Sequence, residues 1–285
     1  MKGIILAGGY GTRLYTSTIA VSKQLLPVYD KPMIYYPLSN LMLAGIREIL
    51  IISNPEEKIR FQTLLGSGNQ WGLSFTYLIQ EKPGGLAESF LIGKQFIGDD
   101  EVCLILGDNI FFGTNFGDRL RNASKNVDGA VIFAYPVKEP SGFGVVELDD
   151  GLNAVSLEEK PSNPKSNLAV PGIYFYDNQV LDLVTKIKPS NRGELKITDI
   201  NKAYMEMGKL RVEFLGRGTA WLDAGTHITL LQAASFIQTV QERQGMMISS
   251  PEEIAFKMGY INKNEVHKQA KKYINTSYGD YLLNI

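Results

Sequence analysis

The chain has 285 residues, of which 44% are hydrophobic and 21% charged, a balance that is ordinary for a globular protein. It contains 29 Lys and Arg residues and 30 Asp and Glu residues. The resulting net charge of -1 excludes a general attraction to nucleic acid or to an anionic membrane. The single cysteine, Cys103, excludes an intramolecular disulfide, and the first apolar run is too short for a signal peptide or a membrane span, so we expect a cytoplasmic protein.

The first half of the chain alternates short apolar runs with helical patterns. Four runs predict buried strands, at residues 2–7, 48–53, 74–79 and 101–106. Three stretches predict helices, at residues 32–44 and 55–65, which both begin with proline, and at residues 85–96. This alternation predicts a parallel, twisted sheet with helices on both faces, whose ligands lie at the carboxyl ends of the strands.

Beyond about residue 135 the pattern changes. The runs GFGVVEL and AVSLEE predict a hairpin around residues 149–151. Further strands are predicted at residues 172–177, 210–215 and 219–223, and helices near residues 178–186 and 198–207. From residue 226 onward helical patterns predominate, at residues 230–243, 251–258 and 263–272, and they predict an added helical unit.

The first predicted strand continues into a glycine-rich loop, GGYGTR at residues 8–13. Such a loop can hold phosphate with its backbone N–H groups. It lacks the Gly-Lys-Ser or Gly-Lys-Thr ending of a P-loop, and it also lacks the third glycine of a dinucleotide-binding loop. The second predicted strand carries no acid at its end, which further disfavours a nicotinamide-dependent dehydrogenase. What remains is either a phosphate loop with one bidentate donor, Arg13, or a tight turn with a solvated arginine.

Charged residues elsewhere extend this pattern. Asp108 follows a strongly apolar strand and Asp223 ends another, so each is a candidate ligand for Mg²⁺ or, alternatively, a turn cap. Lys23, Lys160 and Arg192 are each next to Pro, Gly or Ser and are candidate phosphate ligands or solvated surface charges. Together they suggest a site for two phosphate-bearing ligands and Mg²⁺. Because no nucleophile motif accompanies them, phosphoryl or nucleotidyl transfer is the chemistry that fits.

The motifs taken together resemble a known family. The runs GGYGTRL and SKQLLPVYDKPMIYYPLSNLMLAGI resemble the sugar-1-phosphate nucleotidyltransferases, most closely the members that transfer thymidylate. The resemblance continues through LILGDN, FGVVE, SLEEKP, GIYFYD, RGELKITDIN, LGRGTAWLDAGTH and ERQGMMISSPEEIAF, and so covers essentially the whole chain. It implies an α/β fold, a Rossmann-like mixed sheet flanked by helices with a C-terminal helical extension. The implied core is residues 1–225, with a nucleotide part of about 1–134, a sugar-phosphate part of about 135–225 and a helical tail at 226–285.

The resemblance also implies a reaction. The chain would transfer dTMP from dTTP to α-D-glucose 1-phosphate, giving dTDP-glucose and pyrophosphate by direct, Mg²⁺-assisted in-line attack. This would be the first step towards dTDP-L-rhamnose or a related deoxysugar. Two alternatives stay open, a relative that uses UTP and a catalytically weak regulator that binds nucleotide sugars.

The family's site residues can be carried over one by one. Those implied for the nucleotide are Gly8, Gly9, Gly11, Thr12, Arg13, Lys23, Gln24, Gln80, Gly85 and Asp108. Those implied for the sugar phosphate are Asn109, Gly144, Glu159, Lys160, Val170, Tyr174 and Arg192. Asp108 and Asp223 would hold Mg²⁺, and the implied catalytic residues are Arg13, Lys23, Asp108, Lys160, Arg192 and Asp223.

Two positions depart from the family pattern, and the tail has an implied role. Thr16 stands where the family has proline, and Ala224 stands where it commonly has threonine. By resemblance the tail builds a homotetramer and a regulatory site for a downstream nucleotide sugar such as dTDP-L-rhamnose. That site would include Phe112, Gly113, Arg217 and the stretch 242–251, and the alternative is a plain structural cap.

Overall fold

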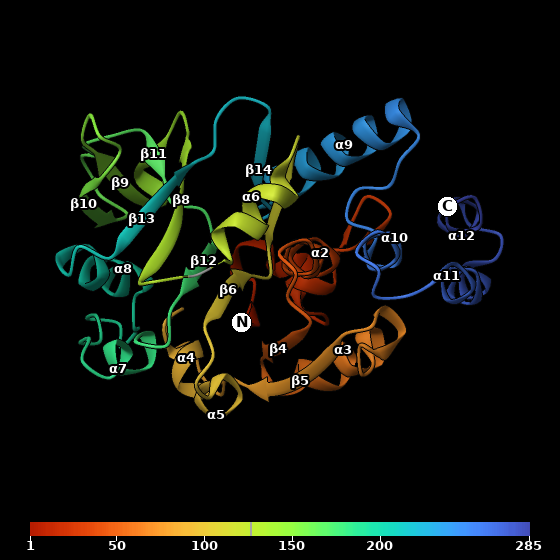
Figure 1. Ribbon diagram of the computed structural model, residues 1–285, viewed down its shortest axis with the longest axis horizontal. Helices are drawn as coiled ribbons and strands as arrows, with labels where there is room; N and C mark the ends of the chain where they lie inside the picture. The colour runs from red at the N-terminus through yellow and green to blue at the C-terminus, as the bar shows by residue number, and fades with distance from the viewer. Residues whose placement is uncertain (126) are drawn as a thin grey trace.

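The computed structural model describes residues 1–125 and 127–285 (Figure 1). Within them a mixed sheet has the strand order β10-β9-β11-β8-β12-β6-β1-β4-β5, and β13 also pairs with β8. Its strands are β1 (Lys2–Ala7), β4 (Glu48–Ser53), β5 (Ser74–Ile79), β6 (Val102–Leu106), β8 (Ala130–Pro136), β9 (Gly144–Leu148), β10 (Ala154–Glu159), β11 (Leu168–Ala169), β12 (Ile173–Tyr176) and β13 (Leu210–Phe214). Two small sheets pair β7 (Asn109–Gly113) with β14 (Thr219–Asp223) and β2 (Pro27–Val28) with β3 (Lys31–Pro32).

The four strands predicted in the first half of the chain are confirmed, and they are mutually parallel. β1 lies between β4 and β6, with Leu6 opposite Ile52 on one side and Leu106 on the other. The rest of the sheet differs from the parallel sheet that alternation alone predicts. β12 runs antiparallel to β6 and β8, so the sheet is mixed, as the resemblance implies.

Helices cover both faces of the sheet. The helices of the described residues are α1 (Tyr15–Thr18), α2 (Tyr35–Leu43), α3 (Lys58–Leu65), α4 (Glu88–Ile92), α5 (Lys94–Ile97), α6 (Phe116–Ala123), α7 (Val180–Val184), α8 (Ile197–Glu206), α9 (His227–Gln244), α10 (Pro251–Lys257), α11 (Lys263–Ala270) and α12 (Ser277–Leu283). Ile5 of β1 enters a core cluster with residues of α2 and α6, and its neighbour Ile4 enters a second cluster with residues of α4, α7 and α8. Because successive strand residues point to opposite faces, the two clusters lie on the two sides of the sheet.

Several predicted helices have different bounds in the structure, and three of these differences have a clear local reason. The helix predicted at residues 32–44 begins only at Tyr35, because Pro32 pairs in the β2–β3 hairpin. The helix predicted at residues 85–96 is broken into α4 and α5 at Gly93. α9 begins earlier than predicted, because the Thr226 side chain accepts a hydrogen bond from the Thr229 N–H and caps the helix.

The predicted C-terminal helices are confirmed as α9, α10 and α11, and a further helix that was not predicted, α12, follows them. α10, α11 and α12 pack into the body of the protein. Figure 1 shows α10, α11 and α12 at one end of the molecule and the antiparallel strands β9 and β10 at the other. Ile254, Val266 and Leu282 of these helices belong to the same buried cluster as Leu38 and Trp71. In the described part of the chain, no helix combines the length and the apolar character needed to span a membrane.

Candidate active site

Two loops meet at the carboxyl edge of the parallel strands. β1 ends at Ala7 and continues into the glycine-rich loop, and β6 ends at Leu106 shortly before Asp108. Leu6 and Leu106 are paired in the parallel register, and the Gly107 N–H donates to the Leu6 carbonyl oxygen at 2.9 Å. The glycine-rich loop and Asp108 therefore lie beside each other, at the edge where open α/β sheets bind ligands.

The glycine-rich loop lines a cavity of about 270 Å³. Gly9 and Gly11 have φ angles of 99° and 57°, which side chains disfavour, so both positions need glycine. Beyond them Leu14 is fully buried and anchors a short 3-10 helix at Thr12–Leu14. The lining residues are Gly8, Gly9, Tyr10, Gly11, Thr12, Arg13, Lys23, Gln24, Asp108 and Gly225. The cavity thus brings together most of the residues that the resemblance implies for the nucleotide.

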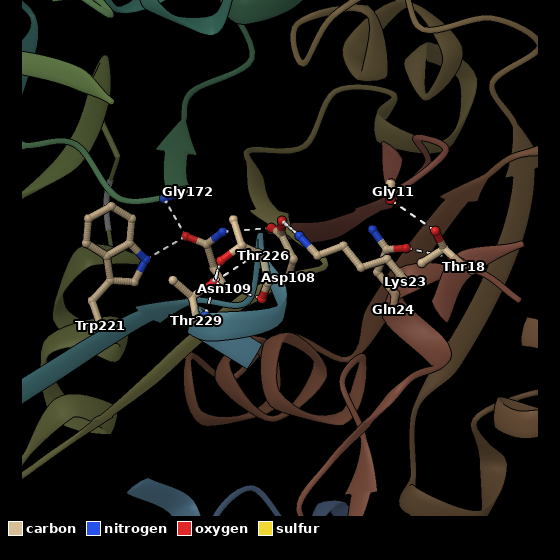
Figure 2. A network of polar contacts seen from close by, with 11 residues as sticks. Gly11, Thr18, Lys23, Gln24, Asp108, Asn109, Gly172, Trp221, Thr226 and Thr229 are labelled. Carbon is tan, nitrogen blue, oxygen red and sulfur yellow. Dashed lines mark hydrogen bonds and ion pairs between the residues drawn. The ribbon is translucent and has the colours of Figure 1, made fainter. Parts of the chain in front are cut away.

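Asp108 and Lys23 form an ion pair at this edge (Figure 2). Lys23 Nζ lies 2.5 Å from Asp108 Oδ2, and the Lys23 side chain is only 8% exposed. The Asn109 amide donates to the other carboxylate oxygen at 2.9 Å. Burial favours the neutral acid, but the Lys23 ammonium and the hydrogen bonds outweigh it, so the pKa of Asp108 lies below its ordinary value. Asp108 is therefore a carboxylate at neutral pH.

Asp223 reaches the same edge from the end of β14. β14 pairs antiparallel with β7, and the register places Asp223 opposite Asn109, the neighbour of Asp108. Burial and the negative charge of Asp108 raise the pKa of Asp223, and the cations of Lys23 and Arg13 partly oppose this shift. The structure therefore brings both predicted metal ligands to one site.

The donor set at this site fits a divalent cation that is held partly by substrate. Across residues 1–125 and 127–285, no group of three or more His, Cys, Asp and Glu could hold a metal ion by itself. Hard cations such as Mg²⁺ are commonly bound by one or two carboxylates together with water and substrate phosphates. The raised pKa of Asp223 beside the charge of Asp108 points the same way, since a bound cation would compensate the repulsion between the two carboxylates.

A second cavity, of about 450 Å³, opens from the two aspartates towards the antiparallel half of the sheet. Its lining includes Arg13, Leu86, Asp108, Asn109, Gly144, Glu159, Lys160, Val170, Gly172, Tyr174, Thr198, Asn201, Trp221 and Asp223. All residues implied for the sugar phosphate except Arg192 are among them. The two cavities share Asp108 and Arg13, so two ligands can meet there.

Asn109 is held firmly in the wall of the second cavity, beside Asp108. Its Oδ1 accepts hydrogen bonds from Trp221 Nε1 at 2.7 Å and from the Gly172 N–H at 3.0 Å. Figure 2 shows these groups in one row, from Trp221 through Asn109 and Asp108 to Lys23. Because its own amide donates to Asp108, Asn109 fixes the orientation of that carboxylate and links it to the wall of the second cavity.

Glu159 and Tyr174 supply further polar groups to the second cavity. The Thr198 hydroxyl donates a hydrogen bond to Glu159 Oε2, which fixes this carboxylate at the end of β10. Burial, followed by the charges of Glu159 and Asp108, raises the pKa of Tyr174 well above its ordinary value, so its phenol stays protonated. A carboxylate acceptor and a hydroxyl donor in one small cavity suit a ligand that carries several hydroxyl groups.

Lys160 and Arg192 lie together in a third cavity, of about 460 Å³. Lys160 also lines the second cavity, whereas Arg192 is exposed and does not. The backbone of Lys160 has a φ of 47°, and its N–H donates to the Phe143 carbonyl oxygen at 3.0 Å. The structure thus brings Lys160 to the site and leaves Arg192 at its outer side.

A fourth cavity, of about 380 Å³, extends from the glycine-rich loop to Gln80 and Gly85. Gln80 Nε2 donates to Glu88 Oε2 at 2.6 Å, and Gln80 Oε1 faces Gly8, where an added Cβ would lie 2.9 Å away. Gly85 has a φ of 92° and packs directly against the backbone of Leu195. The segment that follows Arg192 therefore covers Gly85 and lines the same cavity as Gln80.

A fifth cavity, of about 200 Å³, lies away from these four, beside the tail. Phe112 and Gly113, implied for a regulatory site, line it together with residues 246–250. Arg217 is not among its lining residues.

Sequence reasoning missed four residues at the site. Asn54 hydrogen-bonds both polar groups of the Gly9 backbone, and Thr198 and Trp221 hold Glu159 and Asn109. At Gly225, an added Cβ would lie 2.9 Å from Arg13 Nη2 and 3.2 Å from Asp223 Oδ2. In the sequence, Asn54 directly follows a predicted strand, and Trp221 and Gly225 lie two residues before and after Asp223, a predicted metal ligand. Nearness to these features is the signal that could have singled out the three residues.

The structure shows what Thr16 and Ala224, the two residues that depart from the family pattern, contact. The Thr16 hydroxyl lies 3.2 Å from His227 Nε2, a contact that proline could not make. Ala224 is fully buried, and its methyl group packs in an apolar cluster with Val28, Met33 and Tyr36. The Ala224 N–H donates to the Asp108 carbonyl oxygen at 3.3 Å, so the contact between the two aspartate segments is made by backbone.

The family profile described as "Nucleotidyl transferase" matches residues 2–240 of the chain. A glucose-1-phosphate thymidylyltransferase of Neisseria gonorrhoeae is 56% identical over 285 residues, which cover 100% of this chain and 99% of that protein. A glucose-1-phosphate thymidylyltransferase of Mycolicibacterium smegmatis is 53% identical, again over 285 residues, 100% of this chain and 99% of that protein.

Solved structures give the same picture. A Bacillus anthracis chain assigned to the glucose-1-phosphate thymidylyltransferases, crystallised with sucrose, superposes with a TM-score of 0.77 at 42% identity, over 83% of this chain and 94% of that one. A UDP-glucose pyrophosphorylase complexed with UDP-glucose superposes with a TM-score of 0.72 at 24% identity, over 84% and 98% of the two chains. At that identity the second likeness concerns the fold alone.

Proposed function

We propose, since the chain belongs to the nucleotidyl transferase family, that it transfers dTMP from dTTP to α-D-glucose 1-phosphate and releases pyrophosphate. The observation that carries this proposal is the shared edge at Asp108, where a glycine-lined phosphate cavity meets a cavity lined by hydrogen-bonding groups. Relatives named for this reaction are similar along the whole chain, which supports this pair of substrates. The product, dTDP-glucose, would enter deoxysugar synthesis.

In this proposal dTTP occupies the first and fourth cavities. Its triphosphate lies along residues 8–13 and close to Lys23, where backbone N–H groups and two cations meet. Gln80 and the Gly85 backbone read the thymine edge, and both line the fourth cavity. Gln24 supports the phosphate side, since it is buried and accepts a hydrogen bond from the Ser22 hydroxyl at 2.6 Å.

Glucose 1-phosphate occupies the second cavity. Its hydroxyl groups would bind Glu159, Asn109, Tyr174 and the backbones at Gly144 and Val170, all of which line that cavity. Its phosphate would lie at Lys160, and Arg192 would close on it from the third cavity.

The reaction needs no general base, because the attacking sugar phosphate is already an anion at neutral pH. One of its oxygens attacks the α-phosphorus of dTTP; that O–P bond forms as the bond to pyrophosphate breaks, and the pyrophosphate carries the negative charge away. Arg13 and Lys23 stabilise charge on the transferring and leaving phosphates, and binding both ligands at one edge orients them for attack. Mg²⁺, held by Asp108 and Asp223, would lower the repulsion between the two anions.

The tail has a separate part in the proposal. Residues 1–225 would form the catalytic core, and residues 226–285 would mediate assembly into a homotetramer. The fifth cavity would bind a downstream nucleotide sugar such as dTDP-L-rhamnose as a feedback ligand, since Phe112 and Gly113 line it.

The proposal is tested by pyrophosphate release from glucose 1-phosphate with dTTP, UTP, ATP, CTP or GTP, each with Mg²⁺ and with EDTA. Release with dTTP well above the others, and its loss in EDTA, is the expected result. Release with UTP alone would move the chain to the uridylyl-transferring enzymes. No release from folded protein that binds dTTP would favour the regulator instead.

A further inference from the structure

The glycine-rich loop has few contacts of its own. The side chains of Tyr10, Thr12 and Arg13 are exposed, and the backbone takes positive φ at Gly9 and Gly11. Glycine loses more backbone freedom on ordering than any other residue. Contacts from outside the loop must therefore supply its fixed shape.

The start of the loop is held by Asn54, the residue that follows β4. Asn54 Oδ1 accepts a hydrogen bond from the Gly9 N–H at 3.1 Å, and Asn54 Nδ2 donates to the Gly9 carbonyl oxygen at 3.3 Å. A primary amide carries both a donor and an acceptor, so this one side chain satisfies both polar groups of the Gly9 backbone. Asn54 is 9% exposed and sits at the end of a sheet strand, which makes it a rigid support.

The end of the loop is held by His227, the first residue of α9. Its Nε2 lies 3.2 Å from Thr16 Oγ1 and 3.4 Å from Ser17 Oγ, in α1 directly after the loop. The Thr18 hydroxyl adds an internal bond by donating to the Gly11 carbonyl oxygen at 3.0 Å. Because His227 belongs to the segment that begins at Asp223, the contact ties the loop to the second aspartate.

Arg13 lies between these two supports. Its guanidinium lies beside Gly225, where an added Cβ would be 2.9 Å from Nη2. We infer that Asn54 and His227 are positioning residues, which hold the start and the end of the glycine-rich loop so that it presents Arg13 to a triphosphate. A loop that is ordered before binding loses less conformational freedom when the ligand arrives, and this strengthens binding. The inference rests on the proposed function for the identity of the nucleotide.

The test uses Asn54→Ala, His227→Ala and the double variant of the full-length chain. Each single change should raise the KM for dTTP roughly 5- to 10-fold, the size expected for one or two lost hydrogen bonds. The KM for glucose 1-phosphate should change by less than about 2-fold, since Arg13 is the only residue of the glycine-rich loop that lines the cavity of that ligand. The double variant should lose less than the product of the two single effects, because both contacts order the same loop.

Two further variants separate positioning from a general structural role. His227→Gln keeps a hydrogen-bonding side chain and should restore much of the dTTP affinity lost in His227→Ala. Asn54→Asp keeps the acceptor for the Gly9 N–H, but replaces the donor with a negative charge beside the phosphates, so it should weaken dTTP binding more than alanine does. Asn264→Ala, an exposed change in α11, is the matched control and should alter neither KM.

Inorganic tripolyphosphate, followed by calorimetry, gives a readout that does not depend on the nucleotide. Its affinity should fall in the Asn54 and His227 variants in parallel with the KM for dTTP. One outcome separates the two proposals. If the wild-type protein turns over no dTTP, but the variants bind tripolyphosphate more weakly than wild type does, the proposed function fails and the positioning role stands. Unchanged tripolyphosphate affinity in both alanine variants, or an equal rise in the KM values of both substrates, would overturn the inference.

Discussion

At the residue scale, the two aspartates of the site differ in how they affect folding. The pKa of Asp108 is lowered because Lys23 outweighs burial, so its ionised form contributes stability above about pH 3.8, which is lost as the pH falls through the folded pKa. The pKa of Asp223 is raised by burial and by Asp108, so its ionised form opposes folding. That cost grows as the pH rises from about 3.8 through the folded pKa and is complete above it.

This difference predicts that Asp223→Asn separates stability from activity. Without metal and substrate, the variant should unfold at a higher temperature than wild type at pH 7, because the cost of burying the charge and the repulsion with Asp108 are both gone. Its turnover should fall on the order of 10³-fold, since a metal ligand is lost. Thermal unfolding at pH 7 and pH 3 checks the first part, since the difference should vanish at pH 3. A variant that is less stable at pH 7 would contradict the assignment.

Gly225→Ala should impair catalysis without impairing the fold. The added Cβ would meet Arg13 Nη2 at 2.9 Å, and the end of a flexible side chain can move away at little cost. The displaced guanidinium should lower kcat by roughly 10²-fold, the effect that a misplacement of about 1 Å can have on a catalytic group. Steady-state kinetics and a melting curve check this together. A melting temperature reduced by many degrees with normal kcat would show that the glycine serves packing instead.

At the element scale, the buried strands were the most predictable part of the fold. The inner residues of runs such as 2–7 and 48–53 are continuously apolar because both faces of the sheet are covered by helices, and the structure confirms these strands. β7 was not predicted, although it follows directly after Asp108. Its pairing with β14, which brings Asp223 to Asp108, depends on contacts between residues far apart in the chain, and such pairing leaves no local pattern.

The site residues likewise divide into those marked by a local sequence pattern and those that depend on contacts with distant residues. Arg13 and Asp108 stand next to sequence patterns that mark loops and strand ends, and for this reason they could be singled out from the residues alone. The roles of residues such as Gln80 and Tyr174 came only through the family resemblance. Asn54 and Trp221 act through hydrogen bonds to distant residues, which no spacing in the sequence indicates.

The packing of Gly85 against the backbone of Leu195 is predicted to matter both for folding stability and for dTTP binding. Gly85 has a φ of 92°, and an added Cβ would lie 2.3 Å from the Leu195 carbonyl oxygen, a backbone atom that cannot turn aside. Gly85→Ala should therefore cost about 1–3 kcal/mol of folding stability and weaken dTTP binding at the same time. Denaturant unfolding and the KM for dTTP measure the two effects. A variant with wild-type stability would show that the segment carrying Leu195 closes only when ligands bind.

At the scale of the whole molecule, the tail is distinct in sequence but shares the core. Ile254, Val266 and Leu282 are buried in one cluster with residues of α2 and β4. Each such side chain contributes about 1.5–3 kcal/mol when fully buried, and a domain has only about 5–15 kcal/mol of net stability. The structure thus makes the tail part of the folding unit as well as a candidate for assembly and regulation.

A chain that ends at residue 250 should therefore be insoluble or unfold at a much lower temperature than the full chain. The exposed cluster around Trp71 would then drive aggregation. Light scattering of the full chain and of the truncated chain, with thermal unfolding of each, tests this. A truncated chain that stays soluble with an unchanged melting temperature would show instead that the tail is an independent unit.

The central claim concerns the meeting of the two cavities at Asp108. We propose that two phosphate-bearing ligands react there directly, without a protein group becoming joined to the nucleotide. The stereochemical course at the α-phosphorus tests it most directly, using one diastereomer of dTTP with sulfur on that phosphorus. A single in-line displacement predicts inversion of configuration in the dTDP-glucose analogue. Retention would show two displacements through a covalent nucleotidyl-enzyme, and would contradict the direct attack proposed for this site.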